Sequence, residues 1–103
     1  MATTPAERLG AVWNNRDRAK KTFEASPDDT ALEANADKAQ KALVDSIANG
    51  LTANGPAMET AVERLKSAND EAKDALQTAK TAAAILGALQ KATELAIKVA
   101  AIV

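Results

Sequence analysis

The chain has 103 residues and a net charge of −1, with 13 basic and 14 acidic residues mixed along its length. This length suits a single domain (1–103), and the even mixture of charges provides no basic surface for nucleic acid. Hydrophobic residues make up 47% of the chain, and more than half of them are alanine. Because alanine favours helix strongly, we expect an all-α fold with a thin core.

The residue inventory argues against an enzyme. The chain has no His and no Cys, the side chains most used for proton transfer, thiolate chemistry and zinc binding. Two carboxylate pairs, Glu59 with Glu63 and Asp70 with Asp74, each lie one helical turn apart. They alternate with basic residues such as Lys73, which is typical of a solvated ion-pair face. We therefore predict a non-enzymatic protein with no catalytic residue, no metal site and no cofactor.

The chain begins with a polar segment, Met1 to Arg8, that lacks the apolar stretch of a cleavable signal peptide. The longest uncharged apolar stretch, Thr81 to Gln90, is roughly half of the ~20 residues that a spanning helix needs. We expect neither a signal peptide nor a transmembrane helix. The protein is therefore expected to remain in the cytoplasm or to be exported by a signal-independent route.

The first helix is expected over residues 5–25. Thr4 is its expected cap, a proline occupies the first helical position, and the first turn is acidic. Trp13, the single Trp of the chain, is expected in the core against the second helix. The alternative is a partner-binding role, because Trp is enriched at interaction hot spots.

The second helix is expected over residues 28–49, with Ser26 as its cap and the acidic residues after Pro27 in its first turn. Asn49-Gly50 is expected to end it. The short connection makes the first two helices antiparallel neighbours. The core-facing positions predicted from helical spacing are Leu32, Ala36, Ala39, Leu43 and Ile47.

After Asn54-Gly55-Pro56, helical periodicity continues from Leu65 to the end of the chain. The favoured prediction is one long helix over 56–103, roughly 70 Å in length, which gives a helical hairpin plus a long C-terminal helix. The alternative is a break near residues 80–87 and a four-helix bundle. Isolated Gly87 costs only about 1 kcal/mol inside a helix, so the sequence favours the continuous helix.

The C-terminal segment is the most informative surface, because most of its circumference is aliphatic or alanine. The two opening helices offer few large side chains to cover it, so we expect it to self-associate or to bind a helical protein partner. A membrane-active protein, either pore-forming or lipid-coating, is the less favoured alternative, since interfacial Trp and Tyr are missing from this segment. The predicted interaction residues are Leu86, Leu89, Leu95, Ile97, Val99, Ile102 and Trp13.

A second alternative follows from a resemblance. The Ser26-Pro27-Asp28-Asp29 turn resembles the proline-containing polar turn of the small helical-hairpin subunits of bacterial secretion needles. The resemblance covers about half of the chain and implies a subunit of a helical filament. The residues after Pro56 depart from that pattern, because a hairpin subunit has no such extension.

Overall fold

The computed structural model describes residues 2–78 and 81–102, and these residues form helices and no strand. The all-α fold expected from the sequence is therefore confirmed. The four helices are α1 (Pro5–Ala25), α2 (Thr30–Asn49), α3 (Pro56–Gln77) and α4 (Ala82–Ala101).

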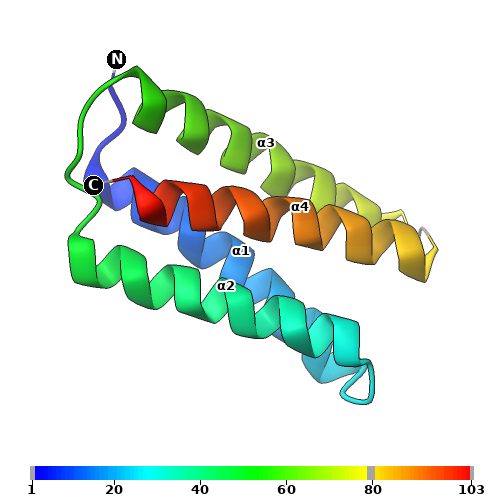
Figure 1. Cartoon of the computed structure of the whole chain (residues 1–103). Helices are drawn as coiled ribbons and strands as arrows, with labels where there is room; N and C mark the ends of the chain where they lie inside the picture. The colour runs from blue at the N-terminus through cyan, green and yellow to red at the C-terminus, as the bar shows by residue number, and fades with distance from the viewer. Residues whose placement is uncertain (1, 79–80, 103) are drawn as a thin grey trace.

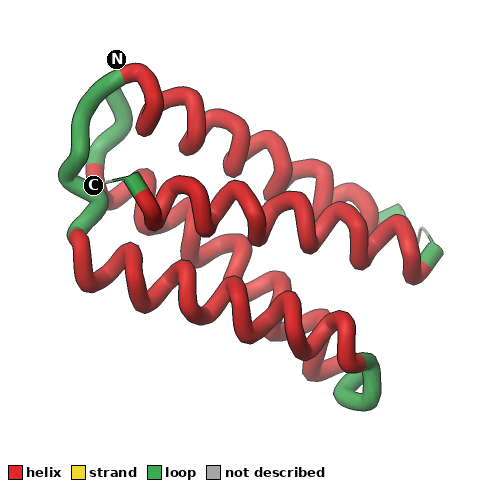
Figure 2. The backbone as a smooth tube through the Cα atoms, viewed as in Figure 1, coloured by secondary structure: helices red, strands yellow, loops and turns green. Residues whose placement is uncertain are grey.

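Successive helices run in opposite directions, and their order around the bundle is α1, α2, α4, α3 (Figure 1). α1 and α4 lie diagonally across the bundle and contact each other. α2 and α3 lie on the other diagonal and do not contact each other. The connections gather at the two ends of the bundle (Figure 2). The segment 50–55 therefore crosses one end, from α2 to the diagonally opposite α3, beside both chain termini.

The continuous helix expected over 56–103 is not confirmed, and the helix count matches the four-helix alternative. α3 closes where the Thr78 N–H donates to the Asp74 carbonyl over 2.9 Å. α4 opens where the Thr81 hydroxyl accepts from the Ala84 N–H over 3.2 Å. Residues 79–80, at the border of the expected break, lie outside the described residues.

The physical reason for the reversal is burial. In a single straight helix of roughly 70 Å, most aliphatic side chains of the C-terminal segment would remain in water. When α4 folds back along α3, its apolar stripe packs against α3 and against the α1–α2 hairpin. The gain from that burial exceeds the modest preference of an alanine run for an uninterrupted helix.

The start of α2 also differs from the expectation. The helix begins at Thr30, and its cap is Asp29, whose carboxylate accepts from the Ala31 and Leu32 N–H groups over 3.0 and 3.1 Å. Ser26 instead ends α1. The Asp29 N–H donates to the Ser26 carbonyl over 3.0 Å and closes a four-residue turn with Pro27 in its second position, which proline favours.

The other helix ends follow the local signals. The Thr4 hydroxyl caps α1 by accepting from the Glu7 N–H over 3.1 Å. α2 ends at Gly50, which has a left-handed backbone conformation with φ of 75°. A residue without a Cβ atom adopts this conformation at little cost, which is why Asn49-Gly50 terminates the helix.

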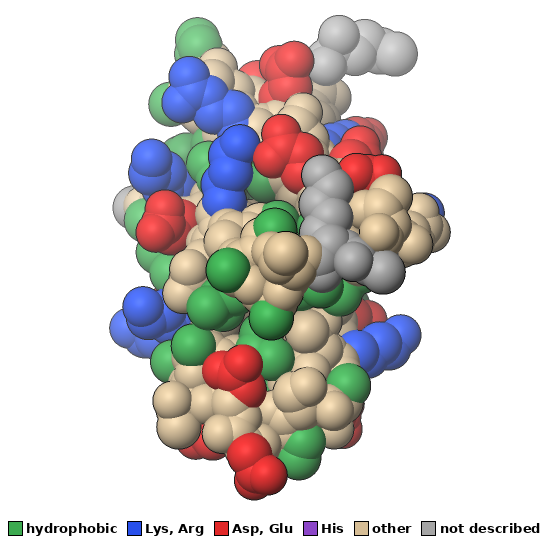
Figure 3. Space-filling model, turned by 90° about the vertical axis from the view of Figure 1, so that its right-hand side faces the viewer, with side chains coloured by type: hydrophobic (Ala, Val, Ile, Leu, Met, Phe, Trp, Pro, Cys, Tyr) green, Lys and Arg blue, Asp and Glu red, His purple; other side chains and the backbone are tan. Residues whose placement is uncertain are grey.

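The core is lined mainly by small residues, so neighbouring helices approach closely and the bundle measures 38 × 24 × 16 Å. The larger of two apolar clusters lies toward the end crossed by the 50–55 segment and includes Val12, Leu43 and Leu65. The smaller cluster, around Leu32 and Leu89, lies toward the opposite end. Figure 3 looks onto that opposite end, where apolar side chains lie among charged and polar ones.

Candidate functional site

The predicted interaction residues of the C-terminal segment do not form one exposed surface. Leu89 and Val99 are fully buried among residues of their own chain, and Ile97 is 41% exposed. α3 and α4 cover each other, so the two opening helices do not have to cover the segment by themselves. The remaining three predicted residues, Leu86, Leu95 and Ile102, are half-buried.

Trp13 is 46% exposed, so its expected place in the core is wrong. Val12 points into the core in its place. The same one-residue displacement occurs on α2, where the expected core residue Ile47 is 56% exposed and Ser46 is buried. Val44, also on α2, is 52% exposed. Three large apolar side chains, Trp13, Val44 and Ile47, therefore remain half exposed on the two opening helices.

These three side chains lie on one face. The Arg16 guanidinium of α1 donates to the Gln40 side-chain oxygen of α2 over 2.7 Å, which shows that these two residues lie at the same level of the antiparallel helices. One helical turn from this bond, toward the 50–55 end, Trp13 lies at the level of Val44. Ile47 follows one turn further, beside half-buried Leu9. We call this outer surface of the hairpin the α1–α2 face.

The other half of the α1–α2 face, toward the turn at 26–29, is charged. Helical spacing places Lys20 of α1 on it next to Arg16, and Glu33 and Asp37 of α2 opposite. Lys20, Glu33 and Asp37 are all exposed, and none takes part in an ion pair within residues 2–78 and 81–102. The α1–α2 face thus has an apolar half and a charged half, with basic residues on α1 and acidic residues on α2.

Each helix also places at least one uncharged polar residue in the core. Asn15 of α1 donates to the Thr93 hydroxyl of α4 over 3.3 Å, and Asn69 of α3 donates to the Ala11 carbonyl of α1 over 3.0 Å. Asn35 of α2 is 4% exposed, and its side-chain amide nitrogen has no hydrogen-bond partner. Buried amides are nearly always paired, so the unpartnered group on Asn35 requires an explanation.

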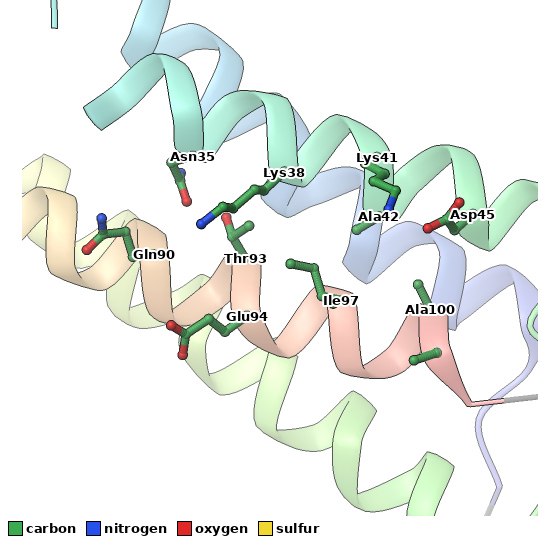
Figure 4. Close-up of a pocket in the computed structure, with 11 residues that line it drawn as sticks. Asn35, Lys38, Lys41, Ala42, Asp45, Gln90, Thr93, Glu94, Ile97 and Ala100 are labelled. Carbon is green, nitrogen blue, oxygen red and sulfur yellow. The ribbon is translucent and has the colours of Figure 1, made fainter. Parts of the chain in front are cut away.

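Asn35 lines a groove of about 480 Å³ between α2 and α4. We call it the α2–α4 groove (Figure 4). At the end near Asn35, Lys38 of α2 reaches toward Thr93 of α4, and Gln90 lies close by. At the other end Ile97 and the alanines of both helices form an apolar wall. The groove is thus polar at one end and apolar at the other.

Arg8 is the largest fully buried polar side chain, with 1% exposure. Its guanidinium donates to the carbonyls of Leu51 and Ala53 over 2.7 and 2.8 Å, to the Thr3 hydroxyl over 2.8 Å, and to Glu59 over 3.0 Å. These bonds tie α1 to the crossing segment and to α3. The buried guanidinium is thus hydrogen-bonded on all three of its nitrogens, as expected of a contact that stabilises the fold.

The four carboxylates of the two predicted pairs are exposed or, at Glu59, half-buried. The Thr3 backbone N–H donates to Glu59 over 2.6 Å, and with the Thr3 hydroxyl and Arg8 it holds the pKa of that carboxyl below its ordinary value. Glu63, its expected partner, is exposed. Asp70 lies near Arg18, where burial lowers the pKa of the guanidinium and the charge of Asp70 opposes that shift. Each pair therefore differs from the close, partly dry arrangement that acid–base chemistry requires.

Sequence reasoning missed the buried polar residues, although a signal was present. Asn35 stands three residues after Leu32 and four before Ala39, on the apolar stripe of α2, and Asn69 stands four after Leu65 on that of α3. A polar residue on an apolar stripe indicates a buried polar group. Within residues 2–78 and 81–102, no group of His, Cys, Asp or Glu side chains is arranged to hold a metal ion. In the same ranges, every helix is too short or too polar to cross a bilayer.

Comparisons with protein-family models, with curated proteins and with solved structures find no match to the chain.

Proposed function

We propose that the chain is a non-enzymatic helical scaffold protein that self-associates through its α1–α2 face. The observation that carries the proposal is the gathering of Trp13, Val44 and Ile47, each about half exposed, on one face of the hairpin. Single exposed apolar side chains are ordinary, whereas a contiguous group of large ones is typical of an interaction surface. The sequence analysis predicted self-association through the C-terminal helix. We propose the α1–α2 face instead, because the large residues of the C-terminal helix are mostly covered by their own chain.

The charge pattern favours a second copy as the partner. A two-fold axis parallel to the helices would lay α1 of each copy over α2 of the other, with the two helices of each contact running in opposite directions. The apolar half would then meet the apolar half. Lys20 and Arg16 of one copy would lie at the level of the acidic residues of α2 in the other, which gives opposite charges at the interface.

The dimensions of the α1–α2 face support a small interface. Helices of about 20 residues are about 30 Å long, and two packed helices are about 20 Å wide, which gives a face of roughly 600 Å². Stable interfaces bury about 800 Å² on each partner, and weaker associations bury less. We therefore expect a dimer that dissociates on dilution.

Sedimentation equilibrium at several protein concentrations tests the proposal. The mass should rise from that of the 10.7 kDa monomer toward twice that value as the concentration increases. Trp13 emission should shift to shorter wavelength over the same concentration range, because dimerisation removes water from the indole. A concentration-independent monomer would contradict the proposal.

Three variants and one control distinguish the α1–α2 face from other surfaces. Val44→Asp places a charge in the apolar half and should leave a monomer at all concentrations. Lys20→Glu should weaken the dimer about tenfold, and adding Asp37→Lys should restore it, since the charges are then exchanged across the interface. Ile97→Asp on α4 is the matched control and should not change the dimerisation constant.

The membrane-active alternative leads to a different result. A lipid-coating protein would float with anionic vesicles at concentrations at which it is monomeric, and Val44→Asp would release it from the lipid. The scaffold proposal expects no flotation of either protein.

A further inference from the structure

We propose that Asn54, in the segment that crosses the end of the bundle, is a site of spontaneous deamidation, and that its isoaspartyl product loosens the junction between the two hairpins. The reaction needs only water as co-reactant. It is favoured where Asn precedes Gly, because the following residue then has no side chain to hinder its backbone nitrogen. The chain contains this dipeptide twice, at Asn49-Gly50 and at Asn54-Gly55. The local structure differs between the two and favours reaction at Asn54.

The reaction begins at the backbone nitrogen of Gly55. This nitrogen loses its proton and attacks the side-chain carbonyl carbon of Asn54, so a nitrogen–carbon bond forms while the bond from that carbon to the amide nitrogen breaks. The amide nitrogen takes up a proton and leaves as ammonia, and a cyclic imide remains. Water then opens the imide. Attack of water at the side-chain carbonyl gives aspartate, and attack at the backbone carbonyl gives isoaspartate, in which the main chain runs through the former side chain.

Both reacting groups are accessible at Asn54-Gly55. The two residues are exposed, and neither the Asn54 side chain nor the Gly55 N–H forms a hydrogen bond within residues 2–78 and 81–102. A Cβ atom added to Gly55 would meet no atom within 4 Å, so the space around this residue is open. The amide side chain is therefore able to turn toward the nitrogen that attacks it.

The corresponding groups are held in place at Asn49-Gly50. The Asn49 side-chain nitrogen donates to the Ala100 carbonyl over 2.7 Å, and its side-chain oxygen accepts from the Leu51 N–H over 2.7 Å. The Gly50 N–H donates to the Ser46 carbonyl over 2.9 Å. Attack at Asn49 requires the side chain to turn and the nitrogen to be released. The loss of these hydrogen bonds should slow the reaction by at least about tenfold.

The other asparagines lie within helices, where the backbone N–H of the next residue is engaged in helical hydrogen bonding. Each is followed by a residue with a Cβ atom, which hinders attack further. These residues are Asn14, Asn15, Asn35 and Asn69.

The position of Asn54 gives the reaction a structural consequence. The Ala53 carbonyl accepts from the buried Arg8 guanidinium over 2.8 Å, and the Gly55 carbonyl accepts from the Glu59 N–H over 3.2 Å in the first turn of α3. Isoaspartate inserts an additional main-chain atom between these two carbonyls, which displaces at least one of them. Aspartate leaves the main chain unchanged and adds a negative charge beside the N-terminus of α3, where such a charge is favourable. Isoaspartate should therefore weaken the junction, whereas aspartate should not.

Incubation of the full chain at mildly alkaline pH, folded and in concentrated urea, tests the assignment. Both dipeptides lie on the tryptic peptide 42–64, so fragment-ion mass spectrometry compares them within one molecule. Each conversion adds about 1 Da. In the folded chain, Asn54 should react at least about tenfold faster than Asn49, and in urea the two rates should agree within about twofold. Equal rates in the folded chain, or a difference that persists in urea, would overturn the proposal.

Two variants separate this reaction from other changes. Asn54→Gln keeps an amide but must close a larger ring, so the aged variant should elute as one species on ion exchange while the native chain divides into more acidic forms. Acidic forms of Asn54→Gln that appear at the native rate would contradict the assignment. Val44→Asp, which is designed to abolish self-association, is the control and should react at the native rate, because Asn54 lies outside the α1–α2 face.

Melting of the separated products tests the structural consequence. The isoaspartyl form should melt about 4 °C or more below the fresh native chain. Asn54→Asp reproduces the aspartyl product and should melt at or above the native temperature. An isoaspartyl form as stable as Asn54→Asp would overturn the inference that isoaspartate loosens the junction.

Discussion

Arg8 and Glu59 are 51 positions apart in the chain and form an ion pair of 3.0 Å between α1 and α3. The arginine is buried and also donates to two carbonyls of the 50–55 segment. One side chain therefore holds the segment that crosses the end of the bundle, including Leu51, whose side chain is buried and whose backbone has a positive φ of 51°. This contact joins the two helical hairpins at that end of the bundle, in addition to the packing of α4 against α1 and α2.

Replacing Arg8 should be the most damaging polar substitution. Arg8→Met keeps much of the side-chain volume, but it leaves two carbonyls without their donor and the Glu59 carboxylate without its charged partner. We expect the free energy of unfolding to fall by about 3 kcal/mol, as measured by urea titration. Arg16→Met, at a partly exposed arginine on the same helix, is the control and should cost less than about 1 kcal/mol. Equal losses for both would contradict the role of Arg8.

Stability should decrease in acid because of Glu59. Hydrogen bonds from Thr3 and the charge of Arg8 lower the pKa of Glu59 in the folded chain, relative to about 4.3 in the unfolded chain. The stabilisation is therefore complete above the unfolded pKa and is lost as the pH falls through the lower, folded pKa. Melting temperatures from pH 7 to pH 2 should show this loss, and the decrease should be smaller in Glu59→Gln. An identical acid profile in the two proteins would rule out this contribution.

The Asn15–Thr93 pair should behave as a coupled unit. Asn15→Leu alone or Thr93→Val alone leaves the other polar group buried without its partner, and each should lower the free energy of unfolding by about 1–2 kcal/mol. The double variant removes both polar groups and should be close to the native stability. A double-mutant cycle by thermal or urea unfolding measures this coupling. Strictly additive effects would show that the two side chains do not interact.

Two glycines should respond oppositely to the same substitution. Gly50→Ala forces a Cβ atom into the left-handed conformation at the end of α2 and should cost about 1 kcal/mol. Gly87→Ala lies inside α4, where an added Cβ would meet no atom within 4 Å, and should stabilise the chain by about 1 kcal/mol. Differential scanning calorimetry of both variants provides the comparison, and a gain from Gly50→Ala would contradict the structure at this cap.

Local chemistry made much of the fold predictable. The Thr4 cap, the Asn49-Gly50 terminator and the proline at position 56 act over a few residues, and they mark helix ends that agree with the structure. The reversal between α3 and α4 was not predictable in the same way, because Thr78 and Thr81 are weak local signals. That reversal depends on tertiary burial, which only the packed helices reveal.

The candidate surfaces were harder to predict for geometric reasons. Val12 and Trp13 are adjacent, as are Ser46 and Ile47, and a rotation of about 100° between neighbours on a helix decides which one is buried. Sequence spacing placed the larger residue of each pair inside, whereas packing placed it outside. Asn35 carried a detectable signal, but its unpartnered state depends on which groups of α4 lie beside it.

The predominance of alanine in the core has a consequence for mutational scanning. Positions such as Ala39, Ala92 and Ala96 are fully buried where helices touch, and an alanine scan skips them because nothing remains to be truncated. Such a scan would therefore miss this part of the core. Substitution by leucine would reveal it, because each added side chain would separate two backbones. At these alanine positions the packed helices leave no room for added volume, so the substitutions that reveal their importance are those that enlarge the side chain.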